Sequence, residues 1–370
     1  MRKGVVIAGY YGANNTGDEA ILTGMLHVLR SQGITDITVL SRNPKQTAQL
    51  HGVKSIYIGR RFDGLGKIYK ALRKSELFIL GGGGLLQDYS KRVVPYWLSR
   101  VIIALLAGTP VVYYAQGIGP LRTNFAKRLV KLISNRVKWI TVRDESSLDK
   151  LNEIRVTKPK LEVTADPALA IKITSDGKKL IENLGIPLNK DDLKMGIALR
   201  CWQGEEKYLN NLISALNSLK KEYNLKFYFF PFQFGEDESI SEQVMQAIEG
   251  DGNYIVKGDF TPEQIAAMLQ EMDGVIAMRL HALILSAVSH TPSFGLIYDP
   301  KVSNFMINLG IEEYTCQLEE VEQQGNDLYD LLNVWIINKD KISRQIEDKM
   351  RDLTAKSLRN AEIVKMLLKK

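Results

Sequence analysis

Arg279 and His281 are the two residues of this sequence whose types and spacing best suit chemistry on a small anion. They follow the apolar run 274–277, which predicts a buried parallel strand. From Leu280 the apolar residues recur with helical spacing, so the pair lies where a strand ends and a helix begins. In an open α/β sheet, ligands bind at that edge. A guanidinium there can hold a carboxylate or phosphate, and an imidazole can donate and recover a proton.

Three more predicted strand ends in the second half of the chain carry polar side chains that belong at the same edge. They are 200–202, 231–233 and 299–301, and they include the cations Arg200 and Lys301. Three cations and a histidine beside a helix N-terminus form a suitable site for a small polyanion. In a structural alternative, Arg279 pairs with Asp273 or Asp299. His281 is then an interior histidine, but the agreement of four strand ends favours the functional interpretation.

The other three histidines have positions that suit structural roles. His27 falls within a predicted helix, His51 in a polar loop, and His290 at a helix C-terminus, where the dipole stabilises a cation. His281 is therefore the candidate for proton transfer.

In the first half, the segment 9–19 links the first predicted strand to its helix and contains Asn15, Asp18 and Glu19. It has neither the glycine spacing of a dinucleotide-binding loop nor the Lys-Ser/Thr ending of a P-loop. Two acids would repel a phosphate, so a neutral, hydroxylated ligand suits this loop better. The structural alternative, acids matched to the positive end of a helix dipole, agrees equally well with the pattern.

Other strand ends of the first half carry glycines and an arginine. The run 81–84 either lets backbone approach a ligand closely or permits a sharp turn. Gln116 is expected in a loop after another strand. Arg143 and Asp144 end a further strand, where Asp144 can cap the next helix.

Strand and helix patterns alternate along the chain and predict an α/β fold. Strands of the first half are expected at 5–8, 37–40, 55–58, 76–80, 110–114, 139–142 and 161–163. Those of the second half are expected at 195–199, 226–230, 254–256, 274–277 and 293–297. Repeated right-handed βα units of this kind form doubly wound parallel sheets.

Polar, turn-rich residues between about 175 and 194 separate the two halves. We therefore expect two Rossmann-like domains, 1–175 and 190–335, and a C-terminal helix, 336–370, that returns to the first domain. Two such sheets with an interdomain cleft make a GT-B-like architecture.

The composition of the chain sets limits on its class. A length of 370 residues suits two domains, and 45% hydrophobic residues exclude a mainly disordered chain. Only Cys201 and Cys316 are present, no signal peptide is evident, and no apolar run is long enough to span a bilayer, so we expect a cytoplasmic protein. The net charge of +7 favours anionic partners, but no nucleic-acid recognition motif occurs.

Basic residues gather on the helix expected at 125–138 and in a second cluster of the first half. That cluster is Arg60, Arg61, Lys67, Lys70, Arg73 and Lys74. A solvated face is the simpler interpretation of the helix by itself. Because both clusters share a half with the candidate acceptor loop, we also expect weak contact with an anionic membrane surface.

In their order along the chain, these motifs resemble the polysaccharide pyruvyl transferase family. The resemblance rests on segments 9–20, 81–84, 116–120, 143–144 and 279–282. It is strongest to the bacterial branch that modifies cell-wall polymers anchoring surface-layer proteins. It implies a GT-B-like fold, phosphoenolpyruvate as donor, and a 4,6-linked pyruvate ketal on a sugar, with no metal and no cofactor. For this branch it implies an N-acetylmannosamine acceptor, lipid-linked or nucleotide-linked, at the inner face of the plasma membrane.

The resemblance also implies roles for individual residues. Arg279 matches the donor-binding arginine, His281 the proposed acid/base, and Arg143 a second arginine. Together with the strand ends, this makes Arg279 and His281 catalytic and makes Arg143, Leu280, Arg200 and Lys301 donor-binding. The expected acceptor-binding residues are Asn15, Asp18, Glu19, Gly83, Gly84 and Gln116.

Two other functions fit the same residues. A GT-B glycosyltransferase would place the phosphates of a nucleotide sugar in the basic site, since a fold does not determine a reaction. A non-catalytic protein that binds an anionic polymer would need no titrating group. Release of phosphate from phosphoenolpyruvate in the presence of an acceptor distinguishes the three.

Overall fold

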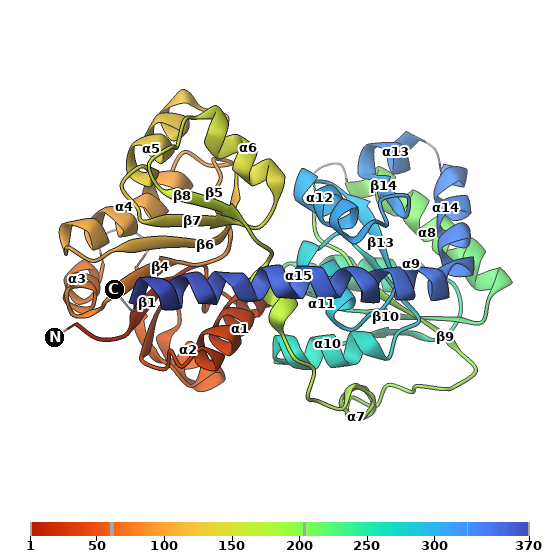
Figure 1. The fold of residues 1–370 in the computed structure, drawn as a ribbon. Helices are drawn as coiled ribbons and strands as arrows, with labels where there is room; N and C mark the ends of the chain where they lie inside the picture. The colour runs from red at the N-terminus through yellow and green to blue at the C-terminus, as the bar shows by residue number, and fades with distance from the viewer. Residues whose placement is uncertain (1, 60–62, 203–204, 324, 369–370) are drawn as a thin grey trace. The chain divides into compact units, whose positions relative to one another are not determined.

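The computed structural model describes residues 2–59, 63–202, 205–323 and 325–368. The chain divides into two compact units, whose elements are labelled in Figure 1. The first unit consists of Met1–Ala170 and Leu353–Lys370, and the second of Ile171–Asp352. Within the described residues, no helix is both long enough and apolar enough to cross a lipid bilayer.

A parallel sheet forms the centre of the first unit. Its strands are β1 (Val5–Ala8), β2 (Ile37–Ser41), β3 (Lys54–Tyr57), β4 (Leu77–Leu80), β5 (Gly83–Leu86), β6 (Val111–Ile118), β7 (Trp139–Val142) and β8 (Lys160–Val163). They are hydrogen-bonded in the order β3-β2-β1-β4-β6-β7-β8, with β5 paired to β6. Val5 lies opposite Ile37 of β2 and Leu77 of β4. The strand order therefore reverses between β1 and β4, the place where open α/β sheets bind ligands.

Helices cover both faces of this sheet. They are α1 (Thr16–Ser31), α2 (Pro44–His51), α3 (Leu65–Lys74), α4 (Val93–Leu106), α5 (Asn124–Ser134), α6 (Glu145–Glu153), the short 3-10 helix Pro167–Ala170 and the end of α15 (Lys339–Leu368). Side chains of a strand alternate between the two faces. Val6 and Ala8 join the buried cluster of α3 to α6, whereas Val5 and Ile7 join that of α1 and α15.

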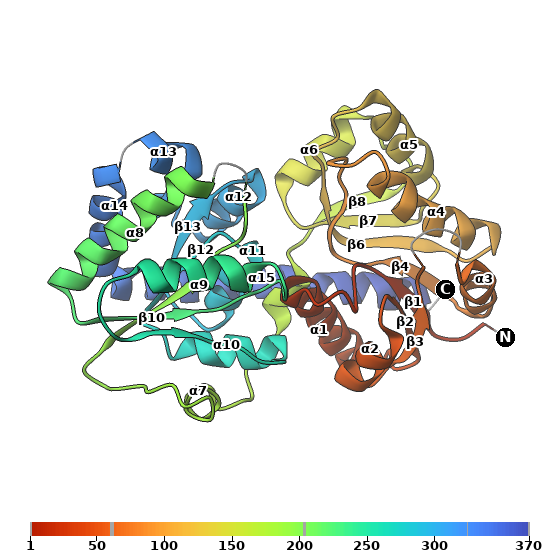
Figure 2. The same cartoon turned by 180° about the vertical axis from the view of Figure 1, so that it is seen from behind.

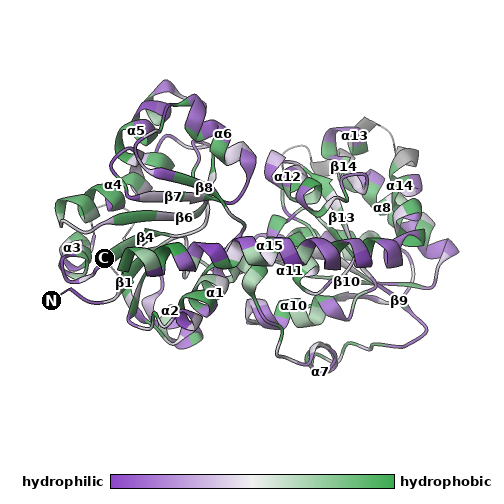
Figure 3. Ribbon diagram, in the orientation of Figure 1, coloured by the Kyte–Doolittle hydropathy of each residue, from purple (hydrophilic) through white to green (hydrophobic). Residues whose placement is uncertain are grey.

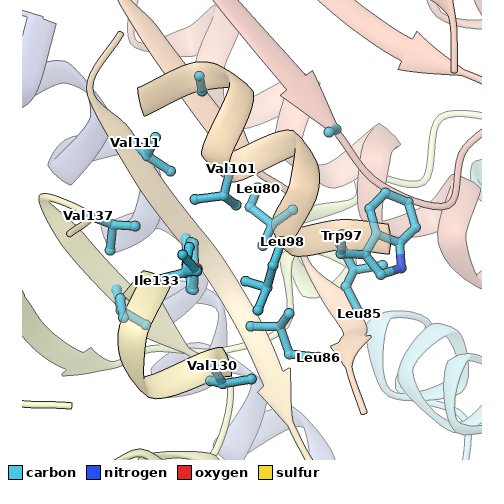
Figure 4. Close-up of a cluster of buried hydrophobic side chains, with 14 of the residues drawn as sticks. Leu80, Leu85, Leu86, Trp97, Leu98, Val101, Val111, Val130, Ile133 and Val137 are labelled. Atoms are coloured by element: carbon cyan, nitrogen blue, oxygen red, sulfur yellow. The ribbon is translucent and has the colours of Figure 1, made fainter. Parts of the chain in front are cut away.

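Figure 4 shows how the first of these clusters is filled. Leu98 and Val101 of α4, and Val130 and Ile133 of α5, are buried around Val111 of β6. The spacing of three residues places each pair on one helical face. Burial of each such side chain contributes about 1.5–3 kcal/mol to stability.

The last turns of α15 are held in the first unit by apolar and polar contacts. In Figure 3 the helix changes from mostly hydrophilic at its start to more hydrophobic near its end, where Ala361 and Val364 are buried. The side-chain oxygen of the buried Asn360 accepts hydrogen bonds from the hydroxyls of Thr141 (2.5 Å) and Thr164 (2.9 Å). Because leaving a buried polar group unpaired costs about 1–3 kcal/mol, this amide fixes the helix beside β7 and β8.

The second unit contains another parallel sheet, seen from behind in Figure 2. Its strands are β9 (Leu193–Ala198), β10 (Leu225–Phe229), β11 (Asn253–Ile255), β12 (Gly274–Ala277), β13 (Ser293–Ile297) and β14 (Thr315–Gln317). Their order is β11-β10-β9-β12-β13-β14, so the order reverses between β9 and β12. The helices are α7 (Gly177–Glu182), α8 (Glu205–Glu222), α9 (Asp237–Ala247), α10 (Pro262–Gln270), α11 (Leu280–Val288), α12 (Pro300–Leu309), α13 (Leu318–Gln323), α14 (Gly325–Ile337) and the start of α15.

The prediction of two doubly wound parallel sheets is confirmed, and the structure adds to the expected elements. β5 and β14 were not predicted, and β5 begins inside the glycine run, where strand propensity is low. The loop expected at Gln116 is wrong, because β6 continues through Ile118. The loop expected at His51 is also wrong, because His51 is the buried last residue of α2.

Candidate active site

The β12–α11 junction has the form that its sequence predicts. Arg279 is the N-cap of α11, in an extended conformation, and His281 lies in the first helical turn. Leu280, between them, is buried. Arg279 makes no side-chain cap of its own helix, and the positive end of the dipole of α11 lies at this junction.

Asp237, a residue that the sequence analysis missed, holds Arg279. The Nε of Arg279 donates to Oδ2 of Asp237 at 2.9 Å, and its Nη2 donates to Oδ1. The Asp237 carboxylate is fully buried at the start of α9 and also accepts from the backbone N–H groups of Phe232 (3.1 Å) and Gln233 (2.8 Å). The guanidinium is therefore held by two parallel hydrogen bonds, which fix both its position and its plane.

This geometry corrects the structural alternative considered for Arg279. Asp273 instead pairs with Lys194, at 3.3 Å. Asp299 caps α12 and lies 3.8 Å from Lys301. The carboxylate that binds Arg279 belongs to Asp237, where the β10–α9 connection meets the helix. In the sequence, the only indication of this partner was an acid just after the strand end 231–233.

Arg200 and Tyr298 make a contact between the strand ends on either side of β12. Arg200 follows β9, Tyr298 follows β13, and the Nη1 of Arg200 donates to the Tyr298 hydroxyl at 2.9 Å. The guanidinium also lies 4.6 Å from the centre of the Tyr298 ring and 5.3 Å from that of Trp202. Since β9, β12 and β13 are neighbours, this contact belongs to the sheet edge that carries Arg279 and His281.

Lys301 adds a second cation to the same tyrosine. Its ammonium lies 5.2 Å from the centre of the Tyr298 ring. Burial by itself raises the pKa of the Tyr298 hydroxyl, but Lys301 and Arg200 favour the phenolate and hold the pKa below its ordinary value. Tyr298 was also missed, because an isolated tyrosine after a strand carries no signal of its partners.

In the first unit, Asn15 and Glu19 after β1 make hydrogen bonds that hold the loop and the start of α1. Asn15 caps α1, and its side-chain oxygen accepts from the backbone N–H of Asp18 at 3.0 Å. Glu19 accepts from the backbone N–H of Gly12 at 2.7 Å and pairs with His51 at 2.7 Å. Glu19 therefore has structural partners in the loop and at the end of α2, beyond the helix dipole that the structural alternative considered.

Asp18 and the glycine run lie side by side at the β1–β4 switch point. A Cβ built on Gly83 would lie 3.6 Å from Oδ1 of Asp18 and 3.1 Å from Ile21. Gly83 also has a positive φ of 94°. A side chain there is therefore disfavoured by the backbone conformation as well as by the close contact with Ile21. A Cβ on Gly84 would lie 2.9 Å from the amide of Gln87.

Gln116 is fully buried, and its amide donates to the backbone carbonyls of Leu80 (3.3 Å) and Gly81. It therefore acts on the position of the glycine run, and any influence on an acceptor passes through that backbone.

Arg143 lies at the end of β7, in a mixed-charge setting. Its guanidinium is 3.4 Å from Asp144 and 3.4 Å from the buried Asp166, which the sequence analysis did not identify. Asp144 also caps α6, as its position predicts. Gly117 of β6 lies against Arg143, since a Cβ there would be 2.9 Å from its Nη2.

The described residues contain no group of three or more His, Cys, Asp or Glu side chains able to hold a metal ion. The side chains described above at the edge of the second sheet offer guanidinium, ammonium, imidazole and phenol groups.

Comparisons with solved structures agree with the fold. HepE from Anabaena in complex with UDP-glucose matches with a TM-score of 0.65 and 13% identity, covering 98% of this chain and 99% of that one. MnaA of S. aureus with UDP matches with a TM-score of 0.66 and 12% identity over 100% and 97% of the two chains. UDP-GlcNAc 2-epimerase from Neisseria meningitidis matches with a TM-score of 0.63 and 14% identity over the full length of both. At these identities the likeness concerns the fold alone.

Comparisons of sequence identify the family. The amylovoran biosynthesis protein AmsJ of Erwinia amylovora is 20% identical, over 92% of this chain and 94% of its own. The family model for polysaccharide pyruvyl transferases matches residues 15–300, which include Asn15, Asp18, Glu19 and the whole β12–α11 junction. Since that match covers well over half of the chain, the protein belongs to the polysaccharide pyruvyl transferase family.

Proposed function

We propose that the protein transfers pyruvate from phosphoenolpyruvate to two hydroxyls of a sugar, forming a 4,6-linked ketal. The acceptor in this proposal is an N-acetylmannosamine residue of a lipid-linked or nucleotide-linked polysaccharide precursor. Family membership supports pyruvyl transfer. The printed name of AmsJ, a biosynthesis protein for the polysaccharide amylovoran, supports a saccharide acceptor.

The observation that carries the proposal is the set of cations at the edge of the second sheet. Phosphoenolpyruvate has a carboxylate and a phosphate, so it needs several positive groups. Arg279 is held in one orientation by Asp237, and Arg200 and Lys301 come from the two sides of β12. The N–H groups of Leu280 and His281, at the start of α11, add a helix dipole.

In this proposal His281 is the acid for the donor. It protonates the methylene carbon of phosphoenolpyruvate, and the adjacent carbon gains oxocarbenium character. One sugar hydroxyl attacks that carbon, phosphate leaves, and the second hydroxyl closes the ketal. The arginines stabilise the carboxylate and the departing phosphate.

Phosphate release from phosphoenolpyruvate, measured with and without an N-acetylmannosamine-containing acceptor, tests the function. We expect release that depends on the acceptor, together with a product that has gained one pyruvate less one water. Consumption of a nucleotide sugar without phosphate release from phosphoenolpyruvate would instead identify a glycosyltransferase. Binding of anionic polymer without either reaction would identify a binding protein.

Replacement of Gly117 with alanine tests the proposed donor contact of Arg143. The added methyl group displaces the guanidinium, which is the mobile end of a side chain, so folding is little affected. We expect kcat/KM for phosphoenolpyruvate to fall about 10- to 100-fold, the size of effect that small misplacements produce. Gly66→Ala, where the new methyl group meets no atom within 4 Å, is the control. Equal rates for the two variants would remove Arg143 from the donor site.

We also propose that the first unit contacts an anionic membrane surface, where a lipid-linked acceptor is held. α5 exposes Arg128 and Lys131 beside Phe125 and Leu132, which are 64% and 53% exposed. On α3 the exposed residues are Lys67, Tyr69, Lys70, Arg73 and Lys74. α4 packs against both helices, so they belong to one face of the sheet. Arg60 and Arg61 of the expected cluster lie outside the described residues.

Co-sedimentation with vesicles tests this contact. Attraction to anionic lipid is worth about 1 kcal/mol for each basic residue near the surface and is screened by salt. We expect binding to anionic but not neutral vesicles, lost at high salt, and weakened by Arg128→Glu with Lys131→Glu. Lys190→Glu with Lys341→Glu, in the second unit, changes the net charge equally and serves as the control. Equal loss in the two double variants would show a general charge effect without a specific surface.

A further inference from the structure

Tyr298 of the second unit lies among aromatic and cationic side chains, and the proposed function gives it no role. It directly follows β13, and its ring is packed edge-on against Trp202 with 4.7 Å between ring centres. Arg200 donates to its hydroxyl, and Lys301 lies over its ring. A phenol held between two cations is an unusual arrangement for a merely structural tyrosine.

The hydrogen bond from Arg200 determines what the hydroxyl can do. A guanidinium has donors only, so the Tyr298 oxygen is the acceptor, at 2.9 Å. This hydrogen bond persists when the hydroxyl loses its proton, and the phenolate oxygen can then accept a proton from another group. Arg200 and Lys301 stabilise the phenolate and lower the pKa of Tyr298. Asp299 opposes this only by pairing loosely with Lys301, at 3.8 Å.

The proposed reaction requires more proton transfer than one imidazole provides. One proton is added to the donor carbon, and two are removed from the sugar hydroxyls. His281 can give the first and recover one from the second hydroxyl. The proton of the first hydroxyl needs another base, and the bridging oxygen of the departing phosphate needs an acid.

Asp237 and Asp299, two described carboxylates at this sheet edge, have other partners. Asp237 receives two hydrogen bonds from Arg279 and two from backbone N–H groups. Asp299 accepts from the backbone N–H of Lys301 as the cap of α12. An acid that is fixed by several donors is a poor base, which leaves the phenol as the better candidate.

We propose that Tyr298 is the second proton-transfer group of this site, acting on the first sugar hydroxyl and then on the leaving phosphate. The inference rests on the proposed function. In the reacting state Tyr298 is the phenolate, which Arg200 and Lys301 stabilise. As the hydroxyl oxygen bonds to the donor carbon, its proton passes to that phenolate oxygen. When the carbon–oxygen bond to phosphate breaks, the electron pair stays with the phosphate oxygen, and the proton moves there from Tyr298. Both Tyr298 and His281 then regain their starting states.

Two variants of the full-length protein test this role by the pH dependence of kcat. Tyr298→Phe keeps the ring contacts and removes only the hydroxyl, so we expect kcat to fall about 100- to 10,000-fold with a small change in the KM for phosphoenolpyruvate. An imidazole ordinarily titrates well below a phenol, so the alkaline limb of the profile follows Tyr298. Site-specific incorporation of 3,5-difluorotyrosine at position 298 lowers the phenol pKa, and that limb should move to lower pH. Tyr254→Phe, on the edge strand β11, is the control and should behave as the wild type.

The outcomes separate this inference from the proposed function. A wild-type protein that releases no phosphate from phosphoenolpyruvate with any acceptor contradicts the function itself. A wild type that turns over, with a Tyr298→Phe variant of equal kcat, contradicts only the role of Tyr298. A raised KM with an unchanged pH profile of kcat would make Tyr298 a positioning residue for Arg200. An alkaline limb that does not move when 3,5-difluorotyrosine replaces Tyr298 would also overturn the proposal.

Discussion

Turnover is expected to fall about 100- to 10,000-fold when His281 is replaced by alanine, because the donor carbon must gain a proton before the sugar attacks. His281 lies in the first turn of α11, and alanine is the residue that most favours a helix. The fold should therefore survive the change. The measurement is phosphate release from phosphoenolpyruvate with acceptor, supported by thermal unfolding of both proteins.

Two further variants make this test specific. His281→Gln keeps hydrogen bonding but cannot transfer a proton, so we expect it to be nearly as inactive as the alanine variant. His290→Asn is the matched control, since His290 follows α11 with a positive φ of 57° that asparagine tolerates. A wild-type rate in either His281 variant would show that the acid is another group.

The second large effect is expected for the pair formed by Arg279 and Asp237. Arg279→Lys keeps the charge but loses the two parallel hydrogen bonds to Asp237 and the planar fork that grips a carboxylate or phosphate. Loss of one hydrogen bond to the charged donor, worth about 1.5–3 kcal/mol, predicts a loss of about 10- to 150-fold in kcat/KM for phosphoenolpyruvate. Steady-state kinetics with varied phosphoenolpyruvate measures this loss.

Asp237→Asn separates the binding role of Arg279 from its structural one. The amide cannot neutralise the guanidinium, and breaking a buried ion pair costs about 3–5 kcal/mol. It also weakens the acceptor of the N–H groups of Phe232 and Gln233, so we expect a clear loss of stability besides a raised KM. An Arg279→Lys variant with normal kinetics and only lowered stability would return the arginine to a structural role beside Asp237.

The pairing of Arg279 with Asp237 also affects how the donor is attracted. The buried carboxylate cancels much of the charge of Arg279, so this residue supplies orientation more than attraction. Arg200 contacts a neutral hydroxyl and aromatic rings, and Lys301 is only loosely paired at 3.8 Å. We therefore expect these two cations to account for most of the long-range attraction of a trianionic donor.

Much of the scaffold could be predicted from local patterns, because they depend on residues close together in the chain. The apolar run 274–277 followed by helical spacing from Leu280 located β12 and α11. Thr261 and Gln264 form a capping box at the start of α10, with proline at the first helical position, and this spacing can be read directly from the sequence. β5 was missed for an equally local reason, since its first two residues are glycines, which have no side chains to form an alternating pattern.

The partners of the site residues were decided by the tertiary structure alone. Asp237 binds Arg279 across 42 positions of sequence, and Tyr298 binds Arg200 across 98. Glu19 and His51 meet across 32 positions because β1 and β2 are neighbours. The order of the strands brings such residues to one edge, and it depends on the packing of whole sheets, which no spacing of residues along the chain records. The sequence could therefore indicate which strand ends carry chemistry, whereas the fold decided which charges are neutralised and which hydroxyl lies between two cations.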